Sequence, residues 1–196
     1  MFHVVLNRGA VRELGADIDV TAIKSWHDHP GLIAALAEQA LAARARLAPA
    51  GAPAWPATIF TAHSLPARIL QEGDPYDAQL RETARLLASR LGLPAERWRF
   101  CYQSASRSPE PWLGPPIEEV LLELIRAGEQ QLLVVPIGFV CDHVEILYDL
   151  DIACRKLAEA HGARLERSQS LNTAPAFIAA LAEIVEREAR GVERGA

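Results

Sequence analysis

The sequence predicts a three-layer α/β fold, in which a parallel sheet is covered by helices on both faces. Short apolar, strand-like runs alternate along the chain with helical patterns, and a parallel connection needs a crossover of helix length. The run 131–139 is almost wholly apolar, as expected for a strand buried on both faces. With 196 residues, 50% of them hydrophobic, the chain is large enough for a substantial core. We therefore expect a single domain over residues 1–196, in which segment 1–16 has no clear pattern.

The individual elements follow from hydrophobic periodicity and from the residues that begin or end each segment. The alternating segment 17–25 predicts a first strand, and Pro30 suits the first turn of a helix that reaches Leu47. Gly92 and Gly162 predict the ends of two later helices. The remaining expected elements are strands beginning at 57 and covering 98–103, 131–139 and 164–167, and helices over 76–91, 116–128, 142–161 and after Thr173.

Composition and charge exclude several classes of protein. The net charge is −5 and the basic residues are scattered, so the sequence has no basic patch typical of nucleic-acid binding. The longest apolar run, 132–141, is too short to cross a membrane, and segment 1–8 lacks the features of a secretory signal. The three cysteines have no paired spacing, which favours buried thiols in a reducing compartment. We expect a cytoplasmic protein.

Three polar side chains follow strand-like runs at the point where each run ends. His63 and Ser104 come directly after two of these runs, and Glu145 follows the third by a few residues. The carboxyl ends of parallel strands lie along one edge of the sheet, where ligands bind in the crevice outside them. The sequence therefore predicts that His63, Ser104 and Glu145 converge on one cleft.

Two interpretations of Glu145 remain open at this stage. Asp142 followed three positions later by Glu145 fits a capping box, in which both side chains satisfy free N–H groups of a helix start. However, Asp149 lies one turn further along, and two carboxylates on one helix face cost stability unless a cation or solvent compensates. Together with His63, these carboxylates offer oxygen and nitrogen ligands for a divalent first-row metal.

Other polar and aromatic residues have ordinary structural explanations beside functional ones. His27 and His29 look like a metal pair, but they lie in a loop before Pro30, where histidines are usually solvated. His143 follows Asp142, the expected helix cap, and could support it. Trp112 is either a core anchor or part of a ligand pocket, because loops after strands also build pockets.

These segments together resemble the ferrochelatases, enzymes that insert ferrous iron into a porphyrin at the end of heme synthesis. The order and spacing of the motifs agree from about residue 26 to residue 181. The matching stretches are Ala62-His63-Ser64-Leu65-Pro66, Gly73-Asp74-Pro75-Tyr76, Tyr102-Gln103-Ser104, Pro111-Trp112-Leu113-Gly114-Pro115 and the run from Val135 to Asp151. The resemblance implies a chelatase-like domain of the flavodoxin-like or Rossmann-like kind.

The resemblance also implies roles for individual residues. His63 matches a histidine that faces the macrocycle and is assigned to metal binding or to removal of pyrrole protons. Glu145 matches the carboxylate opposite it, and Asp149 continues an acidic row proposed as a path for iron or protons. Ser104 and Trp112 are expected to border the porphyrin. The implied partners are a porphyrin and ferrous iron, and the iron is a substrate rather than a permanent cofactor.

The chain also departs from the family pattern. Ala153 stands where some members continue the acidic row, which weakens any auxiliary metal site. Some members hold an iron–sulfur cluster with four cysteines, and this chain has three, so we expect no cluster. Ferrochelatases resemble two similar α/β domains that face each other across the cleft, and this chain matches the second, C-terminal one. The family's N-terminal half is expected to be absent.

Three functional readings therefore remain open. The first is a ferrochelatase, or its catalytic domain, in which His63 and Glu145 are the central residues. The second is a truncated half-domain without catalysis, which binds tetrapyrrole or metal weakly or needs a partner chain to complete the cleft. The third is a small single-domain chelatase for another tetrapyrrole that works as a homodimer.

Overall fold

The computed structural model describes residues 22–47, 55–106 and 108–193, and its sheet confirms the predicted α/β class. Four strands pair in the order β2-β1-β3-β4, and every pairing is parallel. The strands are β1 (Ala57–His63), β2 (Trp98–Gln103), β3 (Gln131–Pro136) and β4 (Arg164–Arg167). The helices are α2 (Pro30–Leu47), α3 (Tyr76–Leu91), α4 (Ile117–Arg126), α5 (Val144–Tyr148), α6 (Arg155–Ala160) and α7 (Pro175–Glu193).

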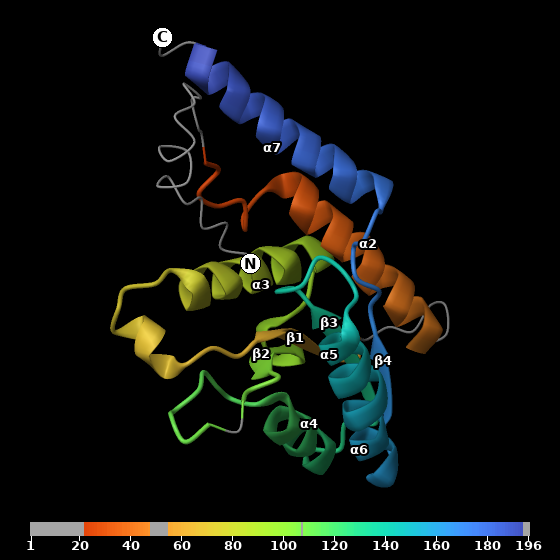
Figure 1. Cartoon of the computed structure of the whole chain (residues 1–196). Helices are drawn as coiled ribbons and strands as arrows, with labels where there is room; N and C mark the ends of the chain where they lie inside the picture. Colours follow the sequence, from red (N-terminus) through yellow and green to blue (C-terminus); the bar gives the residue numbers. More distant parts are fainter. Residues whose placement is uncertain (1–21, 48–54, 107, 194–196) are drawn as a thin grey trace.

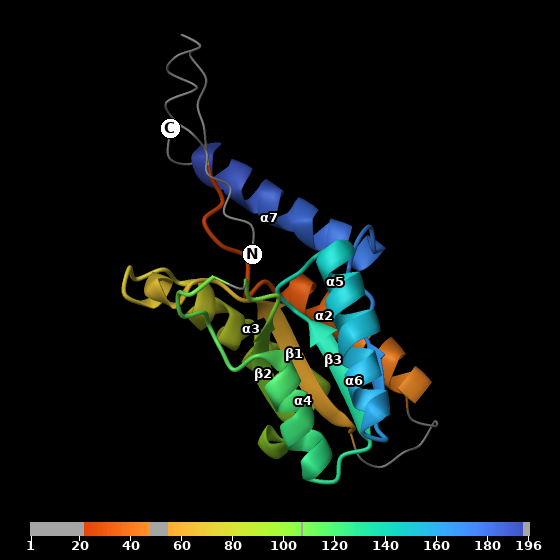
Figure 2. The ribbon, with the colours of Figure 1, turned by 60° about the horizontal axis from the view of Figure 1, so that its bottom comes forward.

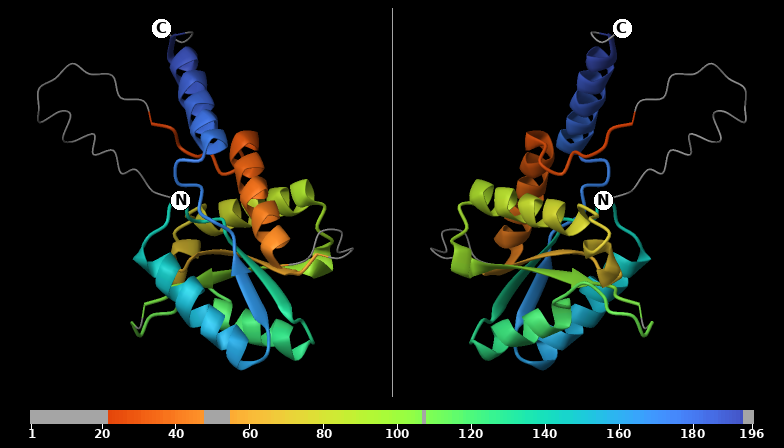
Figure 3. Two further views of the ribbon diagram at one scale, coloured as in Figure 1. Left: turned by 90° about the vertical axis from the view of Figure 1, so that its right-hand side faces the viewer. Right: turned by 90° about the vertical axis from the view of Figure 1, so that its left-hand side faces the viewer.

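Helices cover both faces of the sheet, as the buried strands require. Helices α2 and α3 pack on one face, and α4, α5 and α6 pack on the other (Figure 1). Alternate residues of β1 divide between the two hydrophobic cores, since Phe60 belongs to the first and Ile59 to the second. Helix α7 packs along α2 and extends beyond the body of the sheet (Figure 3).

The strand order has one point at which the connections change direction. The chain passes from β1 to β2 on one side and then returns across β1 to β3 on the other, so the connections diverge between β1 and β3 (Figure 2). In open α/β sheets, ligands bind outside the carboxyl ends of the strands at this point of divergence. His63 is the last residue of β1, and the segment that follows β3 carries Glu145.

Several expected elements differ from the observed ones. Residues 22–25 form no strand, and the rest of the expected strand 17–25 lies outside the described residues. Strand β3 ends at Pro136 rather than at 139, because the chain turns there and Gly138 donates its N–H to the Thr61 carbonyl at 3.1 Å. Helix α7 begins at Pro175, two residues after Thr173, the expected cap.

The expected helix 142–161 is divided into three parts. Helix α5 spans five residues and leads into a π-helical segment, η3 (Asp149–Cys154), before α6 begins. The backbone N-cap is His143, without a side-chain cap bond, so the capping-box interpretation of Asp142 and Glu145 is wrong. π-Helical turns are frequent at functional sites, and periodicity gave no sign of this one.

Candidate functional site

The centre of the site is a contact between His63 and Glu145. The Nε2 atom of His63 lies 3.5 Å from Oε2 of Glu145, and Nδ1 of His143 lies 3.9 Å from the same oxygen. The side chains of His63 and Glu145 are 30% and 53% exposed, so both are open to an incoming ligand. The structure therefore brings together the two residues that the sequence placed at the centre of the cleft.

The orientation of the His63 ring follows from its other nitrogen. The Nδ1 atom is hydrogen-bonded to the Ser64 carbonyl, which can only accept, so the neutral ring carries its proton on Nδ1. In this neutral tautomer, the Nε2 atom that faces Glu145 carries the free lone pair of the ring. Such a nitrogen can take up a proton or coordinate a metal ion.

A short network holds the end of β1 in place. The Tyr76 hydroxyl donates to the His63 carbonyl at 2.9 Å, and the Ser64 hydroxyl donates to the Leu113 carbonyl at 2.8 Å. Burial raises the pKa of Tyr76 above its ordinary value, and the charge of Asp74 adds to this, so its hydroxyl remains a donor. His63 therefore projects from a rigid strand end.

Gly138 allows the segment after β3 to cross close to β1. A Cβ atom at Gly138 would lie 2.6 Å from the Cβ and 2.9 Å from the Cα of Ala62, which is too close for any side chain. The crossing places the Phe139 ring 6.2 Å from the ring of His63 and 4.9 Å from that of His143. Phe139 is buried, so its ring supports from below the two histidines that lie near Glu145.

Asp149 and Ser104 form a second contact beside this centre. The Ser104 hydroxyl donates to Oδ2 of Asp149, and Ser104 has a φ of 60°, a strained value for a residue with a side chain. A hollow lies here, lined in part by Ser64, Gln103 and Glu118. Burial raises the pKa of Cys154 to about 12, with the charges of Glu118 and Asp149 adding to the effect.

The predicted metal ligands do not lie in one cluster. Within the described ranges, no group of three or more His, Cys, Asp or Glu side chains is placed to hold a metal ion together. His63 and Glu145 face each other, whereas Asp149 is engaged by Ser104.

The remaining candidates are placed as follows. The indole of Trp112 is half-buried and donates to the Ser108 hydroxyl at 2.9 Å, and Trp112 does not line the hollow beside Ser104. His27 contacts Glu82 through Nε2 at 2.9 Å, whereas His29 accepts the Gly31 N–H at 3.2 Å. The two histidines therefore engage different partners.

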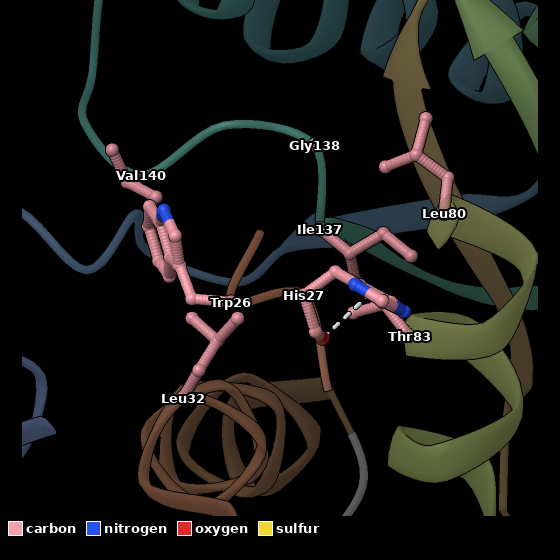
Figure 4. Close-up of a pocket in the computed structure, with 8 residues that line it drawn as sticks. All are labelled: Trp26, His27, Leu32, Leu80, Thr83, Ile137, Gly138 and Val140. Atoms are coloured by element: carbon pink, nitrogen blue, oxygen red, sulfur yellow. Dashed lines mark hydrogen bonds between the residues drawn. The ribbon is translucent and has the colours of Figure 1, made fainter. Parts of the chain in front are cut away.

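A small apolar pocket lies behind the crossing, between α2 and α3 (Figure 4). Trp26, Leu32, Leu80 and Val140 are among its lining residues, and the His27 carbonyl at its edge accepts the Thr83 hydroxyl at 2.9 Å. His27 thus belongs to the wall of this pocket rather than to the crevice.

One expectation about the cysteines is wrong. Cys101 and Cys154 are buried free thiols, as expected, but Cys141 is exposed because it lies in the turn before α5.

Among the described residues, no helix combines the length and the apolar content required to cross a membrane.

The comparisons with known proteins decide the family. The Ferrochelatase family model matches residues 6–189, which is most of the chain. The chain belongs to the ferrochelatase family. It is 47% identical over 182 residues to a ferrochelatase of Deinococcus radiodurans, a match that covers 89% of this chain and 55% of that protein.

Other relatives agree with this assignment. A ferrochelatase of Thermus thermophilus is 42% identical over 90% of this chain and 54% of its own length. A coproporphyrin III ferrochelatase of Geobacillus kaustophilus is 40% identical over 91% of this chain and 55% of its own length. The chain therefore spans about half the length of the curated ferrochelatases it matches.

Sequence reasoning missed part of the surroundings of this candidate site. Arg167 and Asn172, which bind the segment before Glu145, were not singled out. Arg167 ends β4 at the same edge of the sheet as His63, so the strand-end rule could have indicated it.

Proposed function

We propose that this chain carries the metal-inserting site of a ferrochelatase and catalyses entry of ferrous iron into a porphyrin. The observation that carries the proposal is the contact of His63 Nε2 with Glu145 Oε2 at the point where the strand connections diverge. The family assignment supports it, because relatives that align with nearly the whole of this chain are ferrochelatases.

The proposed reaction needs a base and transient metal ligands. As Fe²⁺ enters the ring, two pyrrole N–H protons leave, and the iron–nitrogen bonds replace the N–H bonds. The Nε2 atom of His63 is the proposed proton acceptor: it takes up the first proton, passes it to solvent along the neighbouring carboxylates, and then takes up the second. Glu145 stabilises the resulting imidazolium and offers an oxygen to iron before insertion. Asp149 is the proposed next carboxylate on the iron or proton path, beside the proposed porphyrin contact Ser104.

The surface around Glu145 suits an apolar, planar substrate. Four large apolar side chains of α5 and η3 are exposed on the helix that carries Glu145 and Asp149. They are Val144 (81%), Leu147 (42%), Tyr148 (60%) and Ile152 (44%). Exposed apolar surface of this kind marks a ligand or partner site. We propose that it faces the macrocycle or the protein that closes the other side of the cleft.

The direct experiment is anaerobic metallation by the purified chain. Loss of free-porphyrin fluorescence after addition of ferrous iron is followed with protoporphyrin and coproporphyrin in separate reactions. The proposal expects turnover of one or both, and the preferred ring identifies the substrate. A folded chain that binds porphyrin but never metallates it would disprove activity of this chain alone.

The second candidate function is a half-site that needs a partner chain. The observation that favours it is coverage, since the chain aligns with only 55% of the Deinococcus radiodurans protein. Sedimentation separates the possibilities: an active homodimer supports self-completion of the cleft, and an inactive monomer supports a missing half. We further propose a cytoplasmic setting and no iron–sulfur cluster, on the number and positions of the cysteines.

A further inference from the structure

The start of α5 is not held by its own residues. The helix is five residues long, and its N-cap residue His143 makes no side-chain capping bond. Free N–H groups at a helix start are ordinarily satisfied by such a cap. Because Glu145 lies in the first turn, something outside the helix must fix its position relative to His63.

The loop after β4 binds Asp142, the residue before the N-cap of this helix. Asn172 accepts the Asp142 N–H through Oδ1 at 2.9 Å and donates from Nδ2 to the Asp142 carboxylate at 3.0 Å. The Ser170 hydroxyl donates to the same carboxylate at 2.8 Å, and the Asn172 N–H donates to the Val140 carbonyl at 2.8 Å. Asp142 is therefore fixed through both its backbone and its side chain.

Arg167 binds both ends of the segment 142–151, which carries Glu145 and Asp149. Its Nη1 donates to Asp142 at 3.2 Å, and its Nε and Nη2 donate to the two oxygens of Asp151 at 2.8 and 2.9 Å. Glu145 and Asp149 both lie between Asp142 and Asp151 in the sequence. One guanidinium thus braces the segment before and after the two proposed functional carboxylates.

The contacts of Arg167 with Asp142 and Asp151, which we call the brace, require an arginine. The Arg167 side chain is only 9% exposed, so its charge is stable there because two carboxylates surround it. Burial acts to lower the pKa of Arg167, but Asp151 and Asp142 outweigh it and the pKa is raised, so the group stays charged. A lysine carries one compact ammonium group and cannot make the two-pronged bond to Asp151 while reaching Asp142.

We propose that Arg167 is a positioning residue for the metal-inserting site, through its simultaneous hold on Asp142 and Asp151. The proposal rests on the proposed function for its catalytic consequence. Arg167 sets the distance between Glu145 and His63 and the position of Asp149 relative to Ser104. A change of this geometry by about 1 Å is enough to slow a reaction severely.

The test compares Arg167→Lys and Asp151→Asn with the matched control Arg164→Lys. Arg164 lies on the same strand, is exposed, and donates to the Arg46 carbonyl at 2.8 Å, away from the site. Imidazole resonances of His63 and His143 in the whole chain are followed by NMR, together with the melting temperature. We expect the resonances of both histidines to shift in Arg167→Lys and Asp151→Asn, the two brace variants, and to stay unchanged in Arg164→Lys.

Metallation kinetics give the second readout. In the brace variants we expect kcat to fall about tenfold to a hundredfold, with the porphyrin KM unchanged. Asp151→Asn keeps the Arg167–Asp142 pair, so it serves where Arg167→Lys fails to fold. Folded brace variants whose His63 and His143 resonances match the parent would overturn the proposal, even if they melt earlier. A parent chain without metallation activity would refute the proposed function alone, because the NMR comparison needs no turnover.

Discussion

His63 Nε2 lies 3.5 Å from Glu145 Oε2, although two strands and two long helices separate the two residues in the sequence. The last residue of β1 supplies the imidazole, and the first turn of α5 supplies the carboxylate. Gly138 makes the approach possible because it lets the segment after β3 pass against Ala62. The end of β1 thus places His63, and the segment that follows β3 places Glu145.

The exposed carboxylate of Glu145 gives the first prediction. Glu145→Gln should abolish metallation while changing the free energy of unfolding by less than about 0.5 kcal/mol, because the side chain is 53% exposed and caps no helix. Urea unfolding and the fluorescence assay measure the two effects. Glu159→Gln, an exposed position on α6, is the matched control. A large loss of stability in Glu145→Gln would mean that the residue is structural.

The backbone at Ser104 gives the second prediction. Its φ of 60° is strained for any residue with a Cβ atom, and its hydroxyl donates to Asp149. Ser104→Ala loses the hydrogen bond and keeps the strain, whereas Ser104→Gly loses the bond and relieves it. Ser104→Ala should therefore be less stable than Ser104→Gly by about 1 kcal/mol. Equal stabilities of the two variants in urea would contradict the strained geometry.

Acid sensitivity gives the third prediction. Burial acts to raise the pKa of Asp142, but hydrogen bonds from Asn172 and Ser170 and the charge of Arg167 outweigh it and lower the pKa. A lowered pKa contributes stability at neutral pH that is lost as pH falls below the ordinary carboxyl range, about 4. Asp142→Asn should therefore lose less stability than the parent between pH 6 and about pH 3. Parallel losses in parent and variant, measured by urea unfolding at both pH values, would contradict this role.

Local signals predicted most of the regular structure. Helix α3 and its end at Gly92 are as expected, since an apolar face and a left-handed glycine cap lie within the segment itself. Strands β2 and β4 have the expected bounds as well. The strand-end rule also anticipated that His63 and Glu145 would meet, because the edge of a parallel sheet follows from alternation of strands and helices alone.

The differences arise where distant residues compete with local ones. Asp142 has the sequence position of a helix cap, but Asn172, Ser170 and Arg167 bind its carboxylate instead. The π-helical turn η3 changes the helix register without changing the apolar pattern, so periodicity could not indicate it. Sequence reasoning likewise could not place Ser104 on Asp149, because that bond depends on where η3 lies relative to the end of β2.

The most direct measurement is the initial rate of anaerobic iron insertion by the parent chain and by His63→Ala. Free-porphyrin fluorescence should fall as the parent chain inserts iron. The initial rate for His63→Ala should be lower by about a hundredfold or more, since this variant lacks the proton acceptor. The melting temperature should change little, because the ring is 30% exposed at a strand end. A folded His63→Ala variant that metallates at the parent rate would contradict the account of this site.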